Sequence, residues 1–305
     1  SKLKHAEITR PTKTSLLVRF ITDRPGLTIG FRADIDALAI HEEHNYSYAS
    51  SNPGVMHACG HDGHAAMLMG ACHYFDQHLD QFDGEIWAIF QHAEEVLPSG
   101  AVEMMATGLF DELDFIYAHH LWATQPLGTI DIKSGAASSN TDRYLATLYG
   151  RGGHAAEPEH SIDPIVMGAT AIHKIQTIVS RQLSPHDAGV ISNTLFQAGS
   201  PESINVIPDS VKIGGSVRSS SQKVRELFQK GIETMIATTV EAYGGAYEFH
   251  YDVGNNAVMN DPQATDRVRT ILESALPELE LITQPPMLAG EDFYAFSAKI
   301  PATYL

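Results

Sequence analysis

The chain has 305 residues, a length that fits one large domain or two ordinary ones. Its 37 acidic and 20 basic side chains give a net charge of −17, which argues against a nucleic acid or an anionic membrane as partner, because both require basic patches. The two cysteines supply no disulfide framework, and no signal peptide or bilayer-spanning apolar run is visible, so we expect a cytoplasmic protein.

The first part of the chain alternates strand-like and helix-like segments. The apolar patterns predict strands over 15–20, 27–33, 85–91 and 114–120, and helices over 63–82 and 99–109. The run over 85–91 is almost continuously apolar, as in a strand that is covered on both faces. Such alternation predicts an α/β fold with a mostly parallel sheet and helices on both faces.

The order of elements changes in the middle of the chain. We predict strands over 143–150, 189–197, 211–218 and 246–251, with helices over 163–183 and 221–243. This β-α-β-β-α-β order is that of a ferredoxin-like α+β module. We therefore expect an α/β domain over 1–138 and 253–305, interrupted by an inserted domain over 139–252. The chain opens without methionine and stops in what looks like a buried strand, so we expect it to be trimmed.

Side chains that bind metals form three clusters. Five of them fall within 57–64, a carboxylate pair follows the strand over 85–91, and a histidine pair closes the strand over 114–120; Asp34 and Asp36 follow a further strand. Ligands of open α/β sheets bind beyond the carboxyl ends of the strands. We therefore expect the clusters to converge at one edge of the sheet.

The residue types in these clusters suit a divalent metal. Cys59, His61, Glu95 and His120 offer thiolate, imidazole and carboxylate donors for zinc, with manganese or cobalt as alternatives. A bound metal lowers the pKa of its water, and an adjacent carboxylate, Glu94, is suited to take up the proton. The alternative to a metal site is that the Glu94-Glu95 pair is an ordinary solvated surface feature and that the histidines are simply packed side chains. We expect His119 to point away from the site, because neighbouring side chains of a strand face opposite ways.

The predicted insert carries further polar candidates. His154 lies in a glycine-flanked segment, where the backbone can come close to a ligand. Asn205 offers an amide in a turn, and Arg218 offers a guanidinium that can grip a carboxylate with two hydrogen bonds. The alternative interpretations are that Asn205 only completes the hydrogen bonds of a turn and that Arg218 is an ordinary surface charge.

Taken together, these motifs resemble the M20 family of metallopeptidases and amidohydrolases, in the branch of N-acyl-amino-acid and auxin-conjugate amidohydrolases. The resemblance spans nearly the whole chain in the family's order. The matching segments are 31–38, 56–64, 91–95, 120–122, 150–154, 205–208, 215–218 and 290–293. The chain departs from many relatives at His92 and Val96, on either side of the Ala-Glu-Glu element.

The resemblance implies a site with two divalent ions, zinc or manganese with cobalt or nickel as alternatives. Their ligands would be Cys59, His61, Glu95 and His120, with Glu94 as general base and then general acid. The insert would be a lid and dimerisation domain of a homodimer. His154 would stabilise the oxyanion in the partner subunit's site, and Asn205 and Arg218 would hold the substrate. A further histidine ligand would lie beyond residue 305.

We expect hydrolysis of the amide bond of a small molecule, an N-acyl amino acid or a short peptide, by metal-activated water. One alternative is a dipeptidase or aminopeptidase of the same fold, which would require a free substrate amine. A more distant alternative is a non-catalytic metal-binding or assembly protein.

Overall fold

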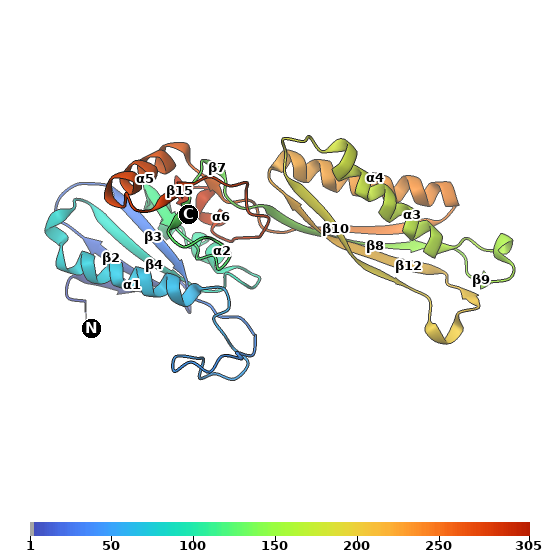
Figure 1. Cartoon of the computed structure of the whole chain (residues 1–305), viewed down its shortest axis with the longest axis horizontal. Coiled ribbons are helices and arrows are strands. Elements are labelled where there is room, and N and C mark those ends of the chain that lie inside the picture. The colour runs from blue at the N-terminus through green and yellow to red at the C-terminus, as the bar shows by residue number, and fades with distance from the viewer. Residues whose placement is uncertain (1–2) are drawn as a thin grey trace. The chain divides into compact units, whose positions relative to one another are not determined.

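A computed structural model describes residues 3–305, in which the chain divides into two units (Figure 1). The first unit contains the chain up to Ala137 together with Val258–Pro285 and Glu291–Leu305. The second unit contains Ser138–Ala257 and Pro286–Gly290. The second unit therefore interrupts the first along the sequence.

A six-stranded sheet in the order β1-β2-β4-β3-β5-β16 organises the first unit. Its strands are β1 (Ala6–Thr9), β2 (Leu16–Ile21), β3 (Thr28–Asp34), β4 (Glu85–Gln91), β5 (Phe115–Ala118) and β16 (Ala302–Tyr304). Strands β4, β3, β5 and β16 run parallel, whereas β2 pairs antiparallel with β4 and β1 antiparallel with β2. The sheet is thus mixed, and the parallel arrangement expected from the sequence applies to one side of it.

The sheet is covered on both faces, which explains the apolar run of β4. Ile86, Ala88 and Phe90 pack with Leu68 and Cys72 of helix α1 (His61–Gln77). The alternate residues Trp87 and Ile89 join a second core cluster on the opposite face. That cluster includes side chains from α2 (Gly100–Met105) and α6 (Tyr294–Ser297), and α5 (Pro262–Ala275) contacts β16.

Helix α1 begins two residues before its expected start. Gly60 takes a left-handed conformation, with φ 86°, at the N-cap. The chain therefore turns into the helix at His61, which becomes its first residue. The helix ends at Gln77, and a 3₁₀ turn over Leu79–Gln81 replaces the last part of the expected helix.

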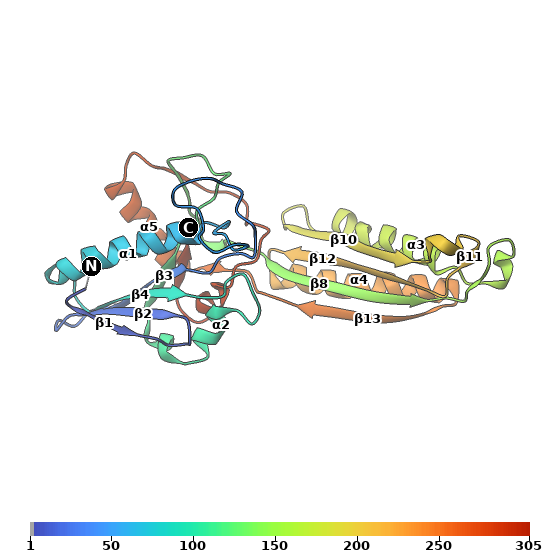
Figure 2. The same ribbon diagram turned by 90° about the horizontal axis from the view of Figure 1, so that it is seen from below.

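The second unit is a four-stranded antiparallel sheet in the order β10-β12-β8-β13 (Figure 2). The elements along the chain are β8 (Asn140–Tyr149), α3 (Pro164–Thr177), β10 (Gly189–Ala198), β12 (Ser210–Ser219), α4 (Gln222–Tyr243) and β13 (Ala246–Val253). Both helices share one apolar cluster with the sheet, so they cover the same face. This element order is that of a ferredoxin-like module.

Short strand pairs complete the architecture. They are β6 (Thr129–Asp131) with β15 (Glu280–Ile282), β7 (Gly135–Ala136) with β14 (Met259–Asn260), and β9 (Gly153–His154) with β11 (Val206–Ile207). Strand β15 therefore pairs with β6 rather than joining the main sheet. Across residues 3–305, no helix has both the length and the apolarity that a membrane span requires.

Candidate metal centre

The metal-binding side chains lie where the parallel strands end. Strand β3 leads to Asp36, β4 leads to Glu94 and Glu95, and β5 leads to His120. The start of α1 adds His61. Because β3, β4 and β5 run parallel, their carboxyl ends share one edge of the sheet, and the segments that follow them meet there.

The structure brings the sequence-predicted metal ligands and Glu94 together. The donor atoms of Cys59, His61 and His120 lie within 4.8 Å of one another, and so do those of His61, Glu94 and Glu95. Cys59 Sγ lies 3.5 Å from His120 Nε2, and His61 Nε2 lies 4.0 Å from Glu95 Oε1. This set of sulfur, nitrogen and oxygen donors fits zinc and related divalent ions.

His61 is oriented by a neighbouring segment. Its Nδ1 lies 3.0 Å from the backbone oxygen of Asp36, which can only accept, so Nδ1 carries the proton of this bond. Its Nε2 is one of the few buried side-chain nitrogen and oxygen atoms in residues 3–305 without a hydrogen-bond partner. A buried polar atom left unpaired costs about 1–3 kcal/mol. The orphaned Nε2 therefore fits a metal ligand.

Acidic neighbours make this group of side chains attractive to cations. Burial alone would lower the pKa of His61, but the hydrogen bond with Asp36 and the charges of Asp34 and Asp36 raise it to about 9. Burial, a hydrogen bond to Glu95 and nearby carboxylates raise the pKa of the Cys59 thiol to about 12. Both groups therefore hold protons at neutral pH that a bound metal would displace.

Asp36 connects two of the candidate ligands. Besides the backbone contact to His61, its carboxylate Oδ2 accepts a hydrogen bond from the backbone N–H of Glu95 at 3.1 Å. Burial would raise the pKa of Asp36, but the hydrogen bonds from His61 and from the backbone hold it below its usual value. Asp36 therefore acts as a charged acceptor beside the candidate ligands.

Glu94 lies in an acidic and largely buried environment. Its carboxylate is grouped with those of Glu291 and Asp292, and its Oε1 accepts a long hydrogen bond of 3.4 Å from the Asp292 backbone N–H. Burial and these two carboxylates raise the pKa of Glu94 well above its usual range, and the nearby Arg32 offsets this only in part. A carboxyl group with such a raised pKa is suited to accept and return a proton near neutral pH.

No sequence pattern predicts the buried ion network next to Glu94, which is centred on Arg32. The Arg32 side chain is 1% exposed and donates to Asp34 at 2.8 Å, Asp292 at 2.8 Å and Glu291 at 3.1 Å. Its Nε also donates to Gln91 at 2.8 Å. Arg32 and Asp292 are 260 positions apart, so no local pattern pairs them. The sequence marked Arg32 and Asp292 as candidates only in that both lie in segments that carry the family resemblance.

His119 contacts His64, and within residues 3–305 its ring nitrogens are not grouped with the donor atoms of the candidate ligands. Its ring centroid is 5.5 Å from that of His64, and its Nε2 is buried without a hydrogen-bond partner among residues 3–305. Burial and the nearby His64 lower the pKa of His119 to about 4, so the ring is neutral. Strand β5 ends at Ala118, before the histidine pair, so the expectation that His119 points away from the site stays a prediction.

Of the three candidates in the second unit, His154 and Asn205 lie on neighbouring segments, whereas Arg218 lies far from both. His154 is exposed on β9, which pairs with β11, and the backbone oxygen of Asn205 accepts from Ala155 N at 3.0 Å. Arg218 lies on β12 opposite Thr141, eight residues beyond the start of that strand at Ser210. At about 3.3 Å per residue, the two ends of this stretch are roughly 26 Å apart.

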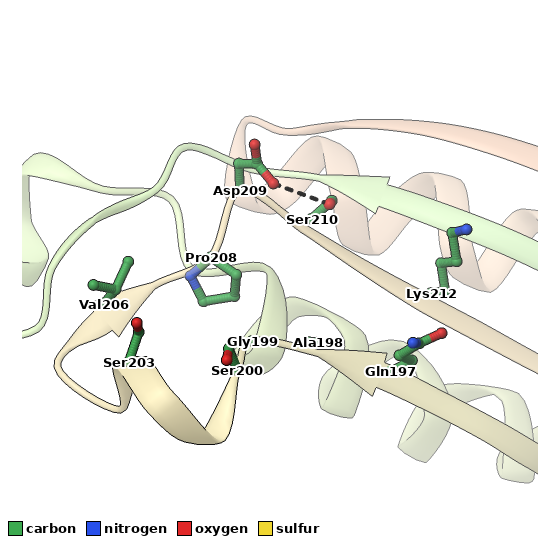
Figure 3. A pocket seen from close by; sticks show the side chains of 10 residues that line it. All are labelled: Gln197, Ala198, Gly199, Ser200, Ser203, Val206, Pro208, Asp209, Ser210 and Lys212. Carbon is green, nitrogen blue, oxygen red and sulfur yellow. Dashed lines mark hydrogen bonds between the residues drawn. The ribbon is translucent and has the colours of Figure 1, made fainter.

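A hollow on the second unit lies near the Asn205 turn (Figure 3). None of its lining side chains is fully buried, and Asn205 is not among them. Asp209 and Ser210 are hydrogen-bonded to each other at 3.0 Å. The lining residues are Gln197, Ala198, Gly199, Ser200, Ser203, Val206, Pro208, Asp209, Ser210 and Lys212. The hollow thus lacks the converging ionisable groups found in the first unit.

Comparison with known proteins gives a consistent picture. The model of peptidase family M20/M25/M40 matches residues 30–305. An N-acyl-L-amino acid amidohydrolase of Geobacillus stearothermophilus is 43% identical over 263 residues, which are 86% of this chain and 70% of that protein. Thermostable carboxypeptidase 1 of Saccharolobus solfataricus is 34% identical, over 95% of this chain and 73% of its own length. The crystal structure of the Bacillus subtilis YXEP protein, described as a dinuclear metal-binding peptidase, superposes with a TM-score of 0.83 at 29% identity, covering 98% of this chain and 77% of that one.

Proposed function

The chain belongs to peptidase family M20/M25/M40 and is a hydrolase of amide bonds, and we propose that it removes the acyl group from N-acyl amino acids or cleaves short peptides. The amidohydrolase relative supports the first substrate class, and the carboxypeptidase relative supports the second. We also propose a cytoplasmic location, which fractionation of cells that express the protein would test.

We propose that Cys59, His61, Glu95 and His120 hold two divalent ions, zinc or manganese, with cobalt or nickel as substitutes. The grouping of their donor atoms and the orphaned Nε2 of His61 support this assignment. When bound, such ions polarise a carbonyl group and lower the pKa of water from about 15.7 to near 7. The Cys59 thiol and the His61 ring would each give up a proton when the site is loaded.

We assign the proton transfers to Glu94. It would accept a proton from the attacking water and then donate it to the nitrogen of the leaving amine. The observation that supports this role most directly is the position of Glu94, grouped with His61 and Glu95 on one side and with Glu291 and Asp292 on the other. The same buried acidic surroundings that raise its pKa make its carboxylate a stronger base than an exposed one.

Glu94→Gln tests this assignment because it removes the proton acceptor and keeps the shape. We expect kcat on N-acetyl amino acids to fall by about 100- to 10,000-fold, with metal content and melting temperature unchanged. Glu112→Gln, at an exposed position of the first unit, is the matched control and should retain full activity. Wild-type turnover in Glu94→Gln would refute the assignment.

We propose that the second unit is a lid and dimerisation domain. Because His154 and Arg218 are widely separated within one copy, they do not meet at one site of that copy, which favours a site completed by a second copy. In this scheme His154 stabilises the oxyanion in the partner's site, and Asn205 and Arg218 hold the substrate.

Mixing inactive subunits tests the shared site. Homodimers of His154→Ala and of Glu94→Gln should both be nearly inactive. Random mixing should restore about a quarter of the wild-type rate, because half of the dimers then hold one intact site. Failure of mixed dimers, verified by mass, to regain activity would contradict a shared site.

The substrate class can be decided by comparing acetylated amino acids with blocked and unblocked dipeptides. A deacylase prefers the acetylated compounds, whereas a dipeptidase or aminopeptidase requires a free amine. Faster cleavage of unblocked dipeptides would favour the second candidate. A metal-loaded wild-type protein that hydrolyses none of these compounds would instead favour the non-catalytic alternative.

A further inference from the structure

We propose that His64 is a positioning residue that holds the Leu121 peptide group and thereby orients His120 for metal binding. This inference rests on the proposed metal site, in which His120 is a ligand. His64 belongs to the same cysteine- and histidine-rich segment as Cys59 and His61, yet its contacts give it a different task.

Both ring nitrogens of His64 are already engaged. The side chain is fully buried, and Nδ1 lies 2.5 Å from Asp34 Oδ1. Nε2 accepts a hydrogen bond from the Leu121 backbone N–H at 2.9 Å. Since a backbone N–H can only donate, Nε2 is unprotonated and Nδ1 carries the proton that is donated to Asp34. The ring thus has no free lone pair for a metal.

The backbone of Leu121 connects His64 to His120, because its N–H contacts one ring and its oxygen contacts the other. The backbone oxygen of Leu121 lies 2.8 Å from His120 Nδ1, so this ring donates from Nδ1. Its Nε2 lone pair is then directed to the other side, where Cys59 Sγ lies 3.5 Å away. His64 therefore determines, through the backbone of one residue, Leu121, which nitrogen of His120 is available as a ligand.

This contact secures a segment that has no regular secondary structure. Leu121 lies beyond β5, and the residue is 47% exposed. The backbone N–H of His120 donates to Leu305 O at 3.0 Å, which secures the preceding peptide. Within residues 3–305, His64 accepts the hydrogen bond from the next peptide N–H, that of Leu121. Loss of this bond would free the His120–Leu121 peptide to rotate.

Asp34, which accepts the hydrogen bond from His64 Nδ1, is itself held firmly in place. Asp34 is fully buried, and its second oxygen accepts from Arg32 at 2.8 Å. Arg32 is in turn held by Glu291 and Asp292. Because every member of this chain of contacts is buried and paired, the position of the His64 ring is well determined.

The test compares two substitutions of His64. A Gln side chain can donate its amide to Asp34 and accept from the Leu121 N–H, whereas Leu keeps the volume and loses both bonds. We expect His64→Leu to weaken Zn²⁺ and Co²⁺ binding by about 10- to 100-fold and to reduce the thiolate-to-Co²⁺ absorption. Its kcat should fall at limiting metal and recover with excess metal, with KM little changed. His64→Gln should stay within about threefold of wild type in metal affinity.

His78→Leu, just beyond the other end of α1, is the control and should leave metal affinity and activity unchanged. Wild-type protein that binds neither ion would refute the proposed metal site itself. If wild type binds the ions and folded His64→Leu binds them equally well, the positioning role is wrong while the metal site stands. If His64→Leu does not fold, ¹⁵N NMR of the metal-free wild type tests the inference instead. We expect Nδ1–H tautomers for His64 and His120. An Nε2–H tautomer at His64 would overturn the inference.

Discussion

At the scale of single residues, the presentation of Glu94 depends on a tight turn after β4. Ala93 has φ 52°, in the left-handed region that non-glycine residues seldom adopt, and its backbone oxygen accepts from Gly100 N at 2.8 Å. A Cβ atom on Gly100 would lie 1.7 Å from the backbone oxygen of His92. Only glycine fits there, so Gly100 and the strained Ala93 together define how Glu94 and Glu95 leave the strand.

We therefore predict that Gly100→Ala displaces the turn. Overpacking of this kind destabilises a protein by about 1–3 kcal/mol, and activity should fall by more than about tenfold because Glu94 and Glu95 move. Gly70→Ala is the control: this exposed glycine within α1 has space for a Cβ, and alanine there should stabilise the protein by about 0.5–1 kcal/mol. Urea denaturation and kcat measurements check both, and an unchanged Gly100→Ala would show that the turn can relax.

At the scale of elements, one buried carboxylate joins three segments of the second unit. Asp142 on β8 accepts from Arg225 of α4 at 2.9 Å, from Tyr251 of β13 at 3.0 Å, and from the Gly254 backbone N–H at 3.0 Å. Arg225 also donates to the backbone oxygen of Asn255 at 2.7 Å. These bonds hold the start of α4 against the strands and the segment after β13.

Removal of Arg225 should therefore leave a buried charge unpaired. We expect Arg225→Ala to cost about 3–5 kcal/mol, seen as lower stability to urea and faster hydrogen exchange in α4. The adjacent pair of Arg143 with Asp252 provides the control, because its side chains are 80% and 38% exposed. Arg143→Ala should cost less than about 1 kcal/mol. Equal effects of both substitutions would contradict the buried role of Arg225.

At the scale of the whole molecule, the candidate site is assembled from distant parts of the sequence. The chain leaves the first unit after Ala137 and returns to it at Val258. The returning segment supplies β16, which pairs with β5, and the acidic residues that bind Arg32. Metal binding and the stability of the first unit should therefore be coupled, because a metal that binds only the folded protein stabilises it.

Metal removal and pH provide the corresponding prediction. A chelator should lower the melting temperature, and zinc should restore it. Because His61 has a pKa raised to about 9 and the Cys59 thiol one raised to about 12, the metal must displace protons below these values. Affinity should therefore rise from pH 6 to pH 9, by up to about tenfold per pH unit for each displaced proton.

Calorimetry in buffers of different ionisation enthalpy counts the protons released when zinc binds at pH 7. Mg²⁺, which prefers oxygen ligands, is the control and should bind weakly and change the melting temperature little. Zinc affinity that is independent of pH, with no proton release, would show that Cys59 and His61 are not ligands.

Local patterns were sufficient for much of the fold. The continuous apolar run of β4, the three-four spacing on α1 and the element order of the second unit follow from side-chain periodicity, which depends on neighbouring residues alone. The cysteine and histidine spacing before α1, the Glu-Glu pair and the histidine pair likewise marked the segments that the structure brings together.

Other features were decided only by the tertiary structure. The short edge strand β1 and the pairing of β15 with β6 depend on which partners are nearby. Two partners of Arg32, Glu291 and Asp292, lie 259 and 260 positions away. His61 Nε2 has no hydrogen-bond partner among residues 3–305, whereas His64 Nε2 accepts from a peptide N–H, and this difference depends on contacts with separate segments. The sequence alone thus determines which groups are present, and the folded chain decides which of their atoms remain free to bind.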